Sequence, residues 1–426
     1  MMDRKKVLII TGTTFRNDTN NGKTLNSLFA NFNKSELAQI YFSPEVPNCD
    51  SCSSYYRINE KQLIKSFFGL LPKKCGGEIS VDINNKKIDR YNANIVFNKS
   101  KTFVLLLREI LWDISHWKNR NLKQWLDKVN PTTIFAFFPG NKKTAKFIRW
   151  VAERYNCKLV MFVTDDHYND STINPSYIRK LRYKRMQKEI DKLPKYSDII
   201  IGCSELTAKE YGEKFNLAYE AIYTPADKCF LEMPLKVHNN KPVILRYFGN
   251  VELERWKVLH ELGNTIKNYN GNTQKAKLEV YTSIANDEII NALNIEGACE
   301  FKGFVTGDEF YQLFQDADIA VHIESFSPRM MRYTRLSIST KIADYLGGGK
   351  CILAIGDKTL ASIAHITPVS MTVNNLEDLP NAIEKLVSNP EFRQNLQEKA
   401  RELCDKDHNA EIICSRMRSI LLGEIK

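Results

Sequence analysis

The fold prediction starts from His-Ile-Glu-Ser-Phe at residues 322–326 and Ser-Ile-Ser-Thr-Lys-Ile-Ala-Asp-Tyr-Leu-Gly-Gly-Gly-Lys-Cys-Ile-Leu-Ala at residues 337–354. The first stretch is typical of a buried strand that ends in a carboxylate, Glu324. The second reads as Ser and Thr at the start of a short helix, which ends at three glycines before the next buried strand. In a parallel α/β sheet, ligands bind beyond the carboxyl ends of the strands. We therefore expect a ligand site where these two stretches meet.

Each residue type in this pattern suits a different chemical group of a ligand. Glu324 is expected to accept hydrogen bonds from sugar hydroxyls. The free N–H groups at the helix start, with the hydroxyls of Ser339 and Thr340 and the ammonium of Lys341, would suit a diphosphate. The alternative is that Ser339 and Thr340 are ordinary helix caps and that Lys341 is a solvated surface charge.

Outward from these stretches, short β-branched runs alternate with longer helical patterns, which is typical of parallel sheets covered by helices. The strands expected in the first half are 7–11, 38–42, 133–137, 158–163 and 198–202. Those expected in the second half are 243–248, 277–281, 298–302, 319–323, 351–354 and 369–373. Helices are expected at 142–155, 204–215, 379–387, 390–404 and 410–422. Residues 50–101 are less regular and are expected to hold loops or an inserted hairpin.

The pattern restarts after a polar segment, so the sequence predicts two domains. We expect an N-terminal domain at 1–228, a linker at 229–242 and a C-terminal domain at 243–405. The last helical pattern, at 406–426, is expected to pack back toward the N-terminal domain.

The amino-acid composition indicates the charge of the binding partner but not its chemical identity. The 426 residues include 61 Lys and Arg against 50 Asp and Glu, and the net charge of +11 favours an anionic partner. No nucleic-acid recognition module is visible. The first apolar run, 7–10, is too short for a signal-peptide core, and no run reaches the ~20 residues of a membrane span. Ten scattered cysteines, with one CxxC at 49–52, indicate reduced thiols and a cytoplasmic location.

The 322–354 region resembles the donor site of GT-B glycosyltransferases, specifically glycosyltransferase family 4 of the bacterial surface-polysaccharide type. Glu324 matches the first acid of the family pattern, and Asp344 in Asp-Tyr-Leu-Gly-Gly-Gly-Lys matches the second. The chain departs from that pattern in two ways. The second acid is Asp rather than Glu, and residues 327–338 add a basic loop with Arg329, Arg332 and Arg335.

Further segments follow the family's order. Residues 247–257 resemble the first strand-loop of the donor domain, in which Gly249 lets the backbone approach the donor and either Arg255 or Lys257 neutralises the diphosphate. Residues 301–318 and 197–205 resemble two other family runs, and the loop 20–24, with Gly22, falls where the family places a glycine loop facing the cleft. The resemblance implies a GT-B fold, in which two Rossmann-like domains face a central cleft. It also implies that the N-terminal domain is the acceptor side and that the C-terminal domain binds the nucleotide-sugar donor.

The acid or base acting on the acceptor is sought at the end of a central N-domain strand, at Asp165, Asp166 and His167. A carboxylate or histidine there could orient or deprotonate an acceptor hydroxyl. The residues do not decide which of the three acts, and both aspartates could instead be turn residues. Asp316-Ala317-Asp318 has the letters of a metal motif, but its place before a buried strand favours a helix end.

The resemblance implies a retaining, metal-independent hexosyltransferase without a cofactor. The donor would be a nucleoside-diphosphate sugar, with a UDP-sugar as first choice, and the acceptor a polyprenyl-linked or other oligosaccharide in surface-polysaccharide synthesis. Alternatives are a GT-B sugar-nucleotide epimerase and a non-catalytic GT-B partner protein. The apolar and basic stretches 67–74 and 103–125 would suit shallow attachment to the inner face of the plasma membrane, although 103–125 could equally be a core helix.

Overall fold

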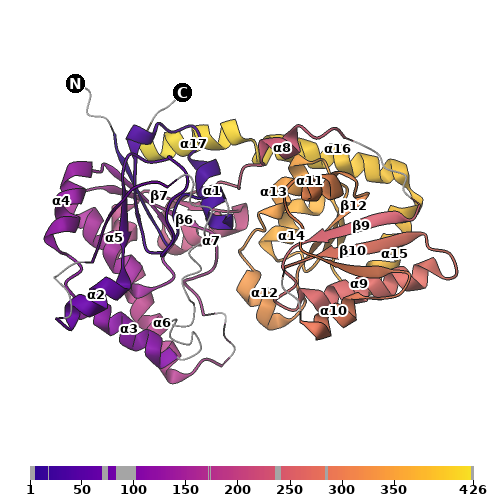
Figure 1. Ribbon diagram of the computed structural model, residues 1–426, viewed down its shortest axis with the longest axis horizontal. Coiled ribbons are helices and arrows are strands. Elements are labelled where there is room, and N and C mark those ends of the chain that lie inside the picture. Colours follow the sequence, from indigo (N-terminus) through magenta and orange to yellow (C-terminus); the bar gives the residue numbers. More distant parts are fainter. Residues whose placement is uncertain are drawn as a thin grey trace. The chain divides into compact units, whose positions relative to one another are not determined.

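The computed structural model describes residues 5–17, 19–69, 75–82, 102–170, 172, 174–235, 241–283 and 286–423. The chain forms two compact units, each with its own sheet (Figure 1). Unit 1 comprises Met1–Thr224 together with Ala410–Lys426, and unit 2 comprises Pro225–Asn409.

Unit 1 contains an eight-stranded sheet with the order β4-β3-β2-β1-β5-β6-β7-β8. All neighbouring strands are parallel except β3 and β4. The described strands are β1 (Val7–Thr11), β2 (Leu37–Tyr41), β3 (Tyr55–Ile58), β4 (Gly76–Ile79), β5 (Thr133–Phe137), β6 (Lys158–Val163), β7 (Ile199–Gly202) and β8 (Ala218–Ala221). Strand β1 is buried along its whole length, because helices cover both faces of a parallel sheet.

The helices of unit 1 begin and end at residues that favour such boundaries. Asn141 and Ser204 each accept a hydrogen bond from the third amide of the helix that follows, and Asn156 and Asn216 close the same two helices in the left-handed conformation. The helices are α1 (Asn20–Leu28), α2 (Glu60–Phe67), α3 (Thr102–Ile114), α4 (Arg120–Val129), α5 (Lys142–Tyr155), α6 (Tyr177–Ile190), α7 (Glu205–Phe215) and α17 (Ala410–Leu422).

Unit 2 contains a six-stranded parallel sheet with the order β11-β10-β9-β12-β13-β14. Numbered within the unit, this is the order 3-2-1-4-5-6 of a dinucleotide-binding fold, whose strand order reverses between β9 and β12. The strands are β9 (Val243–Phe248), β10 (Ala276–Tyr281), β11 (Cys299–Gly303), β12 (Ile319–Ile323), β13 (Ile352–Ile355) and β14 (Met371–Val373).

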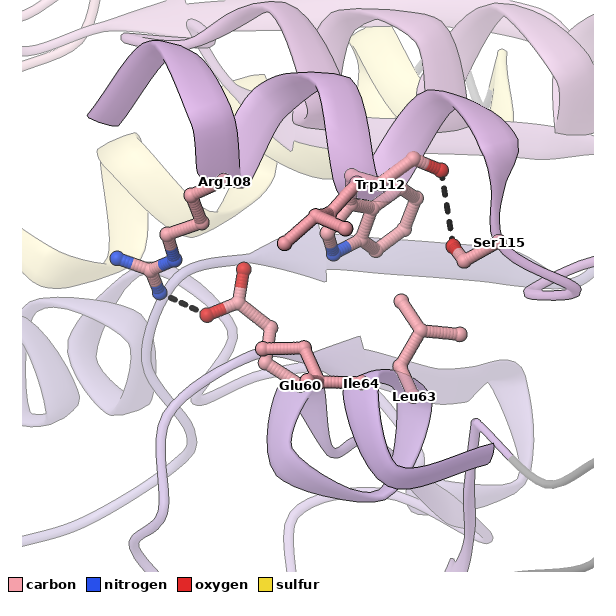
Figure 2. Close-up of a pocket in the computed structure, with 7 residues that line it drawn as sticks. Glu60, Leu63, Ile64, Arg108, Trp112 and Ser115 are labelled. Atoms are coloured by element: carbon pink, nitrogen blue, oxygen red, sulfur yellow. Dashed lines mark hydrogen bonds and ion pairs between the residues drawn. The ribbon is translucent and has the colours of Figure 1, made fainter. Parts of the chain in front are cut away.

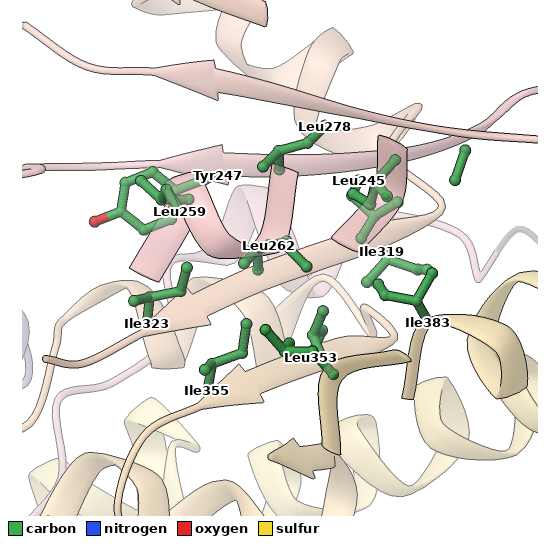
Figure 3. Close-up of a cluster of buried hydrophobic side chains, with 14 of the residues drawn as sticks. Leu245, Tyr247, Leu259, Leu262, Leu278, Ile319, Ile323, Leu353, Ile355 and Ile383 are labelled. Carbon is green, nitrogen blue, oxygen red and sulfur yellow. The ribbon is translucent and has the colours of Figure 1, made fainter. Parts of the chain in front are cut away.

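Alternation along the strands of unit 2 divides its core between two faces of the sheet. Ile319 and Ile323 of β12 pack with helices α9 and α15 (Figure 3). Ala320, between them, packs on the opposite face. The helices of this unit are α8 (Lys228–Leu231), α9 (Arg255–Asn270), α10 (Asp287–Leu293), α11 (Gly307–Gln315), α12 (Pro328–Thr334), α13 (Lys341–Gly347), α14 (Ala361–Ile366), α15 (Leu379–Ser388) and α16 (Pro390–Asp407).

The predicted fold class is confirmed, since both units are α/β with largely parallel sheets. Every predicted strand is present within two residues of its expected ends. The sequence missed β3, β4 and β8. Burial does not alternate from residue to residue along β8, because its first two residues are exposed at the sheet edge. The irregular region does contain an antiparallel pair, β3 and β4, but helix α2 connects the two strands where a hairpin was expected.

The unit boundaries differ from the expected ones. Unit 2 begins at Pro225, so the segment 229–242, expected as a linker, belongs to unit 2 and contains most of α8. Helix α17 belongs to unit 1. Its Arg418 donates to the carboxylate of Glu36, and the hydroxyl of Thr133 donates to the carbonyl of Leu421.

Candidate active site

The candidate site lies in unit 2, where the carboxyl ends of β9 and β12 meet. Arg255 is the first residue of α9, and Glu324 directly follows β12. Arg255 Nη2 donates to Glu324 Oε2 at 2.8 Å, and the two side chains are only 18% and 4% exposed. The hydroxyl of Ser362, on α14, lies 3.4 Å from the second oxygen, Glu324 Oε1. The predicted acid is therefore held in place by two other elements.

Lys341 brings a second positive charge to the same place. Its ammonium lies against Gly249, so closely that a Cβ at position 249 would overlap Lys341 Nζ. Burial, and then the positive charge of Arg255, lower the pKa of Lys341 to about 8, although Asp344 and Glu324 act in the opposite direction. Burial alone would lower the pKa of Arg255, but the negative charge of Glu324 outweighs it and raises that pKa. Two cations thus lie near the buried carboxylate of Glu324, and Arg255 is paired with it.

A small pocket opens among these side chains. Its volume of about 20 Å³ is room for one water molecule or for an oxygen of a bound anion. A bound sugar nucleotide would therefore extend out of this pocket. The lining residues are Tyr247, Phe248, Arg255, Val321, His322, Ile323, Ser339, Lys341 and Tyr345.

His322 is a buried polar residue in the pocket wall. Its Nε2 lies 3.8 Å from Glu324 Oε1 and has no hydrogen-bond partner within the described part of the chain. Burial and the charges of Arg255 and Lys341 lower the pKa of His322 to about 3, so the imidazole is neutral at physiological pH. The sequence favoured a packed core histidine here, and the structure puts that buried ring beside the predicted acid.

The remaining donor-side residues are distributed unevenly. Ser339 lines the pocket, whereas Thr340 is exposed and its side chain does not cap α13. Asp344 is partly buried in the first turn of α13, close enough to raise the pKa of Lys341. Lys257 is exposed and pairs at 3.1 Å with Glu254, the residue before α9, so of the two basic candidates only Arg255 contacts Glu324.

The basic loop that departs from the family pattern contains a helix, α12. Arg329 and Arg332 are exposed on it, and Arg335 directly follows it. None of the three lines the pocket between Arg255 and Lys341.

The predicted acceptor-side residues lie together in unit 1, in the loop after β6. Asp166 accepts a hydrogen bond from the hydroxyl of Tyr211 at 2.8 Å and from the amide of Asn169 at 3.2 Å, as a turn residue does. The side chains of Asp165 and His167 are 48% and 46% exposed, with Asp165 Oδ2 and His167 Nε2 3.9 Å apart. All three residues are at least partly exposed, but Asp166 is engaged in the turn by these two hydrogen bonds.

Gly22 is not in a loop, contrary to the expectation for residues 20–24. It lies in the first turn of α1 and is buried. A Cβ at position 22 would come within 2.6 Å of Thr19 Oγ1 and 2.7 Å of the Arg16 carbonyl oxygen. Close backbone packing inside unit 1 thus accounts for a glycine at this position.

Sequence reasoning did not include Tyr247 or Ser362 among the site residues. A signal existed for both. Tyr247 is next to the last residue of β9, and Ser362 follows β13, so both lie near carboxyl ends of strands flanking Glu324. The rule that led to Glu324 would have included them if it had been applied to each neighbouring strand.

Four further features can be compared with what the sequence suggested. Asp316 follows the last residue of α11 and Asp318 accepts from the amide of Ile244, so the DxD letters are a helix end, as predicted. No group of three or more His, Cys, Asp or Glu in the described ranges is arranged to hold a metal ion. No helix among the described residues is long and apolar enough to cross a membrane. All ten cysteines are free thiols.

Comparison with known proteins supports the class to which this geometry points. Residues 271–420 match the model of the glycosyl transferase-like family. A search of curated proteins found no match.

Solved GT-B glycosyltransferases share the fold along nearly the whole chain. The N-terminal domain of Candida albicans trehalose-6-phosphate phosphatase aligns with a TM-score of 0.63 and 10% identity, over 99% of this chain and 97% of that one. The E. coli trehalose-6-phosphate protein bound with UDP-2-fluoro glucose aligns with a TM-score of 0.58 and 9% identity, over 98% and 100%. WaaG, a glycosyltransferase involved in lipopolysaccharide biosynthesis, aligns with a TM-score of 0.55 and 9% identity, over 97% and 99%. The fold of this chain is therefore GT-B.

Proposed function

We propose that this protein is a retaining glycosyltransferase that transfers a hexose from a nucleoside-diphosphate sugar, as family 4 enzymes do. The observation that carries the proposal is the cluster of Arg255, Glu324 and Lys341 at the point where the strand order of unit 2 reverses. A parallel sheet binds nucleotides at such a point, and a diphosphate requires positive charge there.

In this proposal, the residues of the cluster contact different parts of the donor. Arg255 and Lys341 would bind the two phosphates, and Glu324 would accept hydrogen bonds from the sugar hydroxyls. Arg255 donates to Glu324, and we propose that donor binding moves the guanidinium toward phosphate and frees one carboxylate oxygen for the sugar. A UDP-sugar is the first choice of donor, since a structural neighbour was solved with UDP-2-fluoro glucose.

On the acceptor side, Asp165 with His167 would orient the attacking hydroxyl. In the reaction the bond between the anomeric carbon and the phosphate oxygen breaks, and a bond to the acceptor oxygen forms with the same configuration. The acceptor proton would pass to a phosphate oxygen of the leaving group or to Asp165. This scheme needs neither a metal ion nor a cofactor.

The acceptor we propose is a polyprenyl-linked or other oligosaccharide in surface-polysaccharide synthesis, at the cytoplasmic face of the inner membrane. Likeness in fold to WaaG, which acts in lipopolysaccharide biosynthesis, supports this choice. The net charge of +11 is consistent with phosphorylated substrates and an anionic membrane surface.

A thermal-shift screen against UDP, GDP, ADP, CMP and their sugars tests the donor. A donor at a hundred times its dissociation constant should stabilise the fold by about 2.7 kcal/mol. Arg255→Ala should abolish this shift, whereas Lys257→Ala, which removes an exposed charge two residues away, should preserve it. Equal shifts in both variants would contradict the assignment of Arg255.

Product analysis with the identified donor tests the reaction. A glycosylated acceptor with retained anomeric configuration is the expected product. An epimerised sugar nucleotide without acceptor would indicate an epimerase, and donor binding without any turnover would indicate a non-catalytic partner protein.

A further inference from the structure

Helix α6 of unit 1 carries six basic residues and one acidic residue among its fourteen. Its three arginines form ion pairs within unit 1. Arg179 pairs with Asp170 at 2.7 Å, Arg182 with Glu109 at 2.8 Å and Arg185 with Asp113 at 3.6 Å. Glu189, the helix's carboxylate, is buried and paired with Arg149. These contacts fix the orientation of α6 against α3 and α5.

The three lysines of α6 lie on its solvent-exposed face. Lys180, Lys184 and Lys188 are exposed, and none of them forms an ion pair within the part of the chain that the structure describes. The separation of arginine and lysine on one helix leaves three uncompensated ammonium groups on the outer face. Lysine suits that position, because its long aliphatic stem can lie along an apolar surface while the charge stays in water.

Large apolar side chains share this outer face. Tyr177, Ile178 and Leu181 are 80%, 38% and 39% exposed. At 3.6 residues per turn, Tyr177, Leu181, Lys184 and Lys188 form one stripe along the helix, with the apolar residues at its N-terminal end. Single exposed apolar residues are ordinary, but three within five residues, next to unpaired lysines, indicate a contact surface.

The neighbouring helix α3 is anchored inward in a similar way and also exposes apolar residues. Its Arg108 pairs with Glu60 of α2 beneath it (Figure 2), and its Glu109 pairs with Arg182 of α6. Leu107 and Ile114 are 44% and 55% exposed, and their spacing of seven places them on one face of α3. In Figure 1, α3 and α6 lie beside each other at the edge of unit 1.

We propose that the outer face of α6, defined by Tyr177, Ile178, Lys180, Leu181, Lys184 and Lys188, docks on a membrane surface that contains anionic lipid. The apolar residues would enter the boundary between headgroups and acyl chains, and the lysines would contact the lipid phosphates. Charge complementarity favours this occupant, since the face carries three cations and no carboxylate of its own helix. It differs from the surface expected from the sequence, which was assigned to 67–74 and 103–125. Residues 70–74 of that expectation lie outside the described residues.

Vesicle flotation with the full-length protein tests the proposal. Binding is expected to vesicles of phosphatidylglycerol and phosphatidylcholine, to weaken steeply between 50 and 500 mM salt, and to be absent with phosphatidylcholine alone. The triple variant Lys180→Gln, Lys184→Gln, Lys188→Gln should lose roughly a hundredfold in affinity, at about fivefold per lysine. The variant Tyr177→Ser, Ile178→Ser, Leu181→Ser should lose the part of the binding that resists salt.

A control variant removes the same charge from other exposed helix positions. Lys128→Gln, Lys399→Gln, Lys406→Gln lies on α4 and α16 and should bind vesicles within about threefold of wild type if only nonspecific net charge is lost. The proposal would be overturned if the two lysine variants lost equal vesicle affinity. It would also be overturned if the wild-type protein did not bind anionic vesicles. Tighter binding to a single-stranded oligonucleotide than to vesicles would instead assign the face to nucleic acid.

This inference builds on the proposed function, because a lipid-linked acceptor lies at a membrane, yet the two can fail separately. Donor binding in the thermal-shift screen should be the same in wild type and in all three variants. If the α6 variants lose vesicle binding but keep donor binding, the loss is assigned to α6. If the wild type binds no donor, this result counts against the proposed glycosyl transfer and leaves the α6 proposal untouched.

Discussion

The two sheets end in charged clusters of different construction. In unit 2, Arg255, Glu324 and Lys341 lie 69 and 17 positions apart in the chain. Arg255 and Lys341 line one small pocket, and Glu324 is buried against Arg255. In unit 1, Asp165, Asp166 and His167 come from a single loop and are partly exposed.

The difference is physical as well as topological. Charges that meet out of water interact strongly, and the buried carboxylate of Glu324 is held in one geometry by Arg255 and Ser362. Half-exposed charges in one loop are screened and can move. This difference is consistent with the proposal that unit 2 binds a diphosphate in a fixed position and that the loop of unit 1 adapts to an acceptor. This comparison yields four predictions.

The largest expected effect is at Glu324. Glu324→Gln keeps the shape but removes the charge, and turnover should fall about a thousandfold if the carboxylate is needed in the transition state. Glu279→Gln is a matched control, because Glu279 is also buried and pairs with Arg246 at 2.7 Å in the same sheet. Both variants should lose stability, but only Glu324→Gln should lose turnover in a donor-consumption assay. Equal turnover in the two variants would remove Glu324 from the mechanism.

A smaller effect should separate the two aspartates of unit 1. Asp165→Asn should lower kcat about a hundredfold, as loss of an acid or base on the acceptor does. Asp166→Asn should leave kcat near wild type and cost about 1–2 kcal/mol of unfolding free energy, because its hydrogen bonds with Tyr211 and Asn169 weaken. Steady-state kinetics and urea unfolding measure the two quantities. The reverse assignment of effects would show that the turn residue acts on the acceptor.

The third prediction concerns pH and Lys341. Because the pKa of Lys341 in the folded protein is about 8, the ammonium is present below that pH and is lost above it. The affinity for a nucleoside diphosphate should therefore fall up to about tenfold per pH unit above 8, until the pKa of the bound state is reached. Titration calorimetry from pH 7 to 9.5 measures this slope. Lys341→Arg keeps its charge over that range, so a slope that persists in this variant must come from another group.

The smallest effect is on stability in acid. The pKa of His322 is about 3 in the folded protein and about 6.5 when unfolded, so the unfolded chain takes up the proton first as the pH falls. Above pH 6.5 the imidazole is neutral in both the folded and the unfolded state, and it has no effect on the free energy of unfolding. Below that pH only the unfolded state binds the proton, so the free energy of unfolding falls, by about 2 kcal/mol at pH 5. Urea unfolding at pH 7.5 and pH 5 should show this loss in wild type and a smaller loss in His322→Gln. His365, whose pKa is also lowered to about 3 by burial and by His408, should still contribute in the variant.

Much of the fold could be predicted from the sequence because the signals are local. Strand β12 reads as five buried residues in a row, and α5 begins after an asparagine cap and ends at an asparagine, so both were found at their observed ends. Strand β4 lacked such a signal, because none of its four residues is buried. Residues 20–24 suggested a glycine loop, yet Gly22 lies in α1, where only packing against Arg16 explains it.

For the candidate site, the sequence by itself determined the residue types and the strand ends at which they lie, since a carboxylate after a buried strand is a local pattern. It could not choose between Arg255 and Lys257, which are two positions apart on one helix and alike in charge. Only the tertiary structure decided that choice, because the neighbourhood of β9 and β12 directs Arg255 toward Glu324 and leaves Lys257 exposed. Contacts across tens of residues depend on the order of strands in the sheet, and no local periodicity encodes that order.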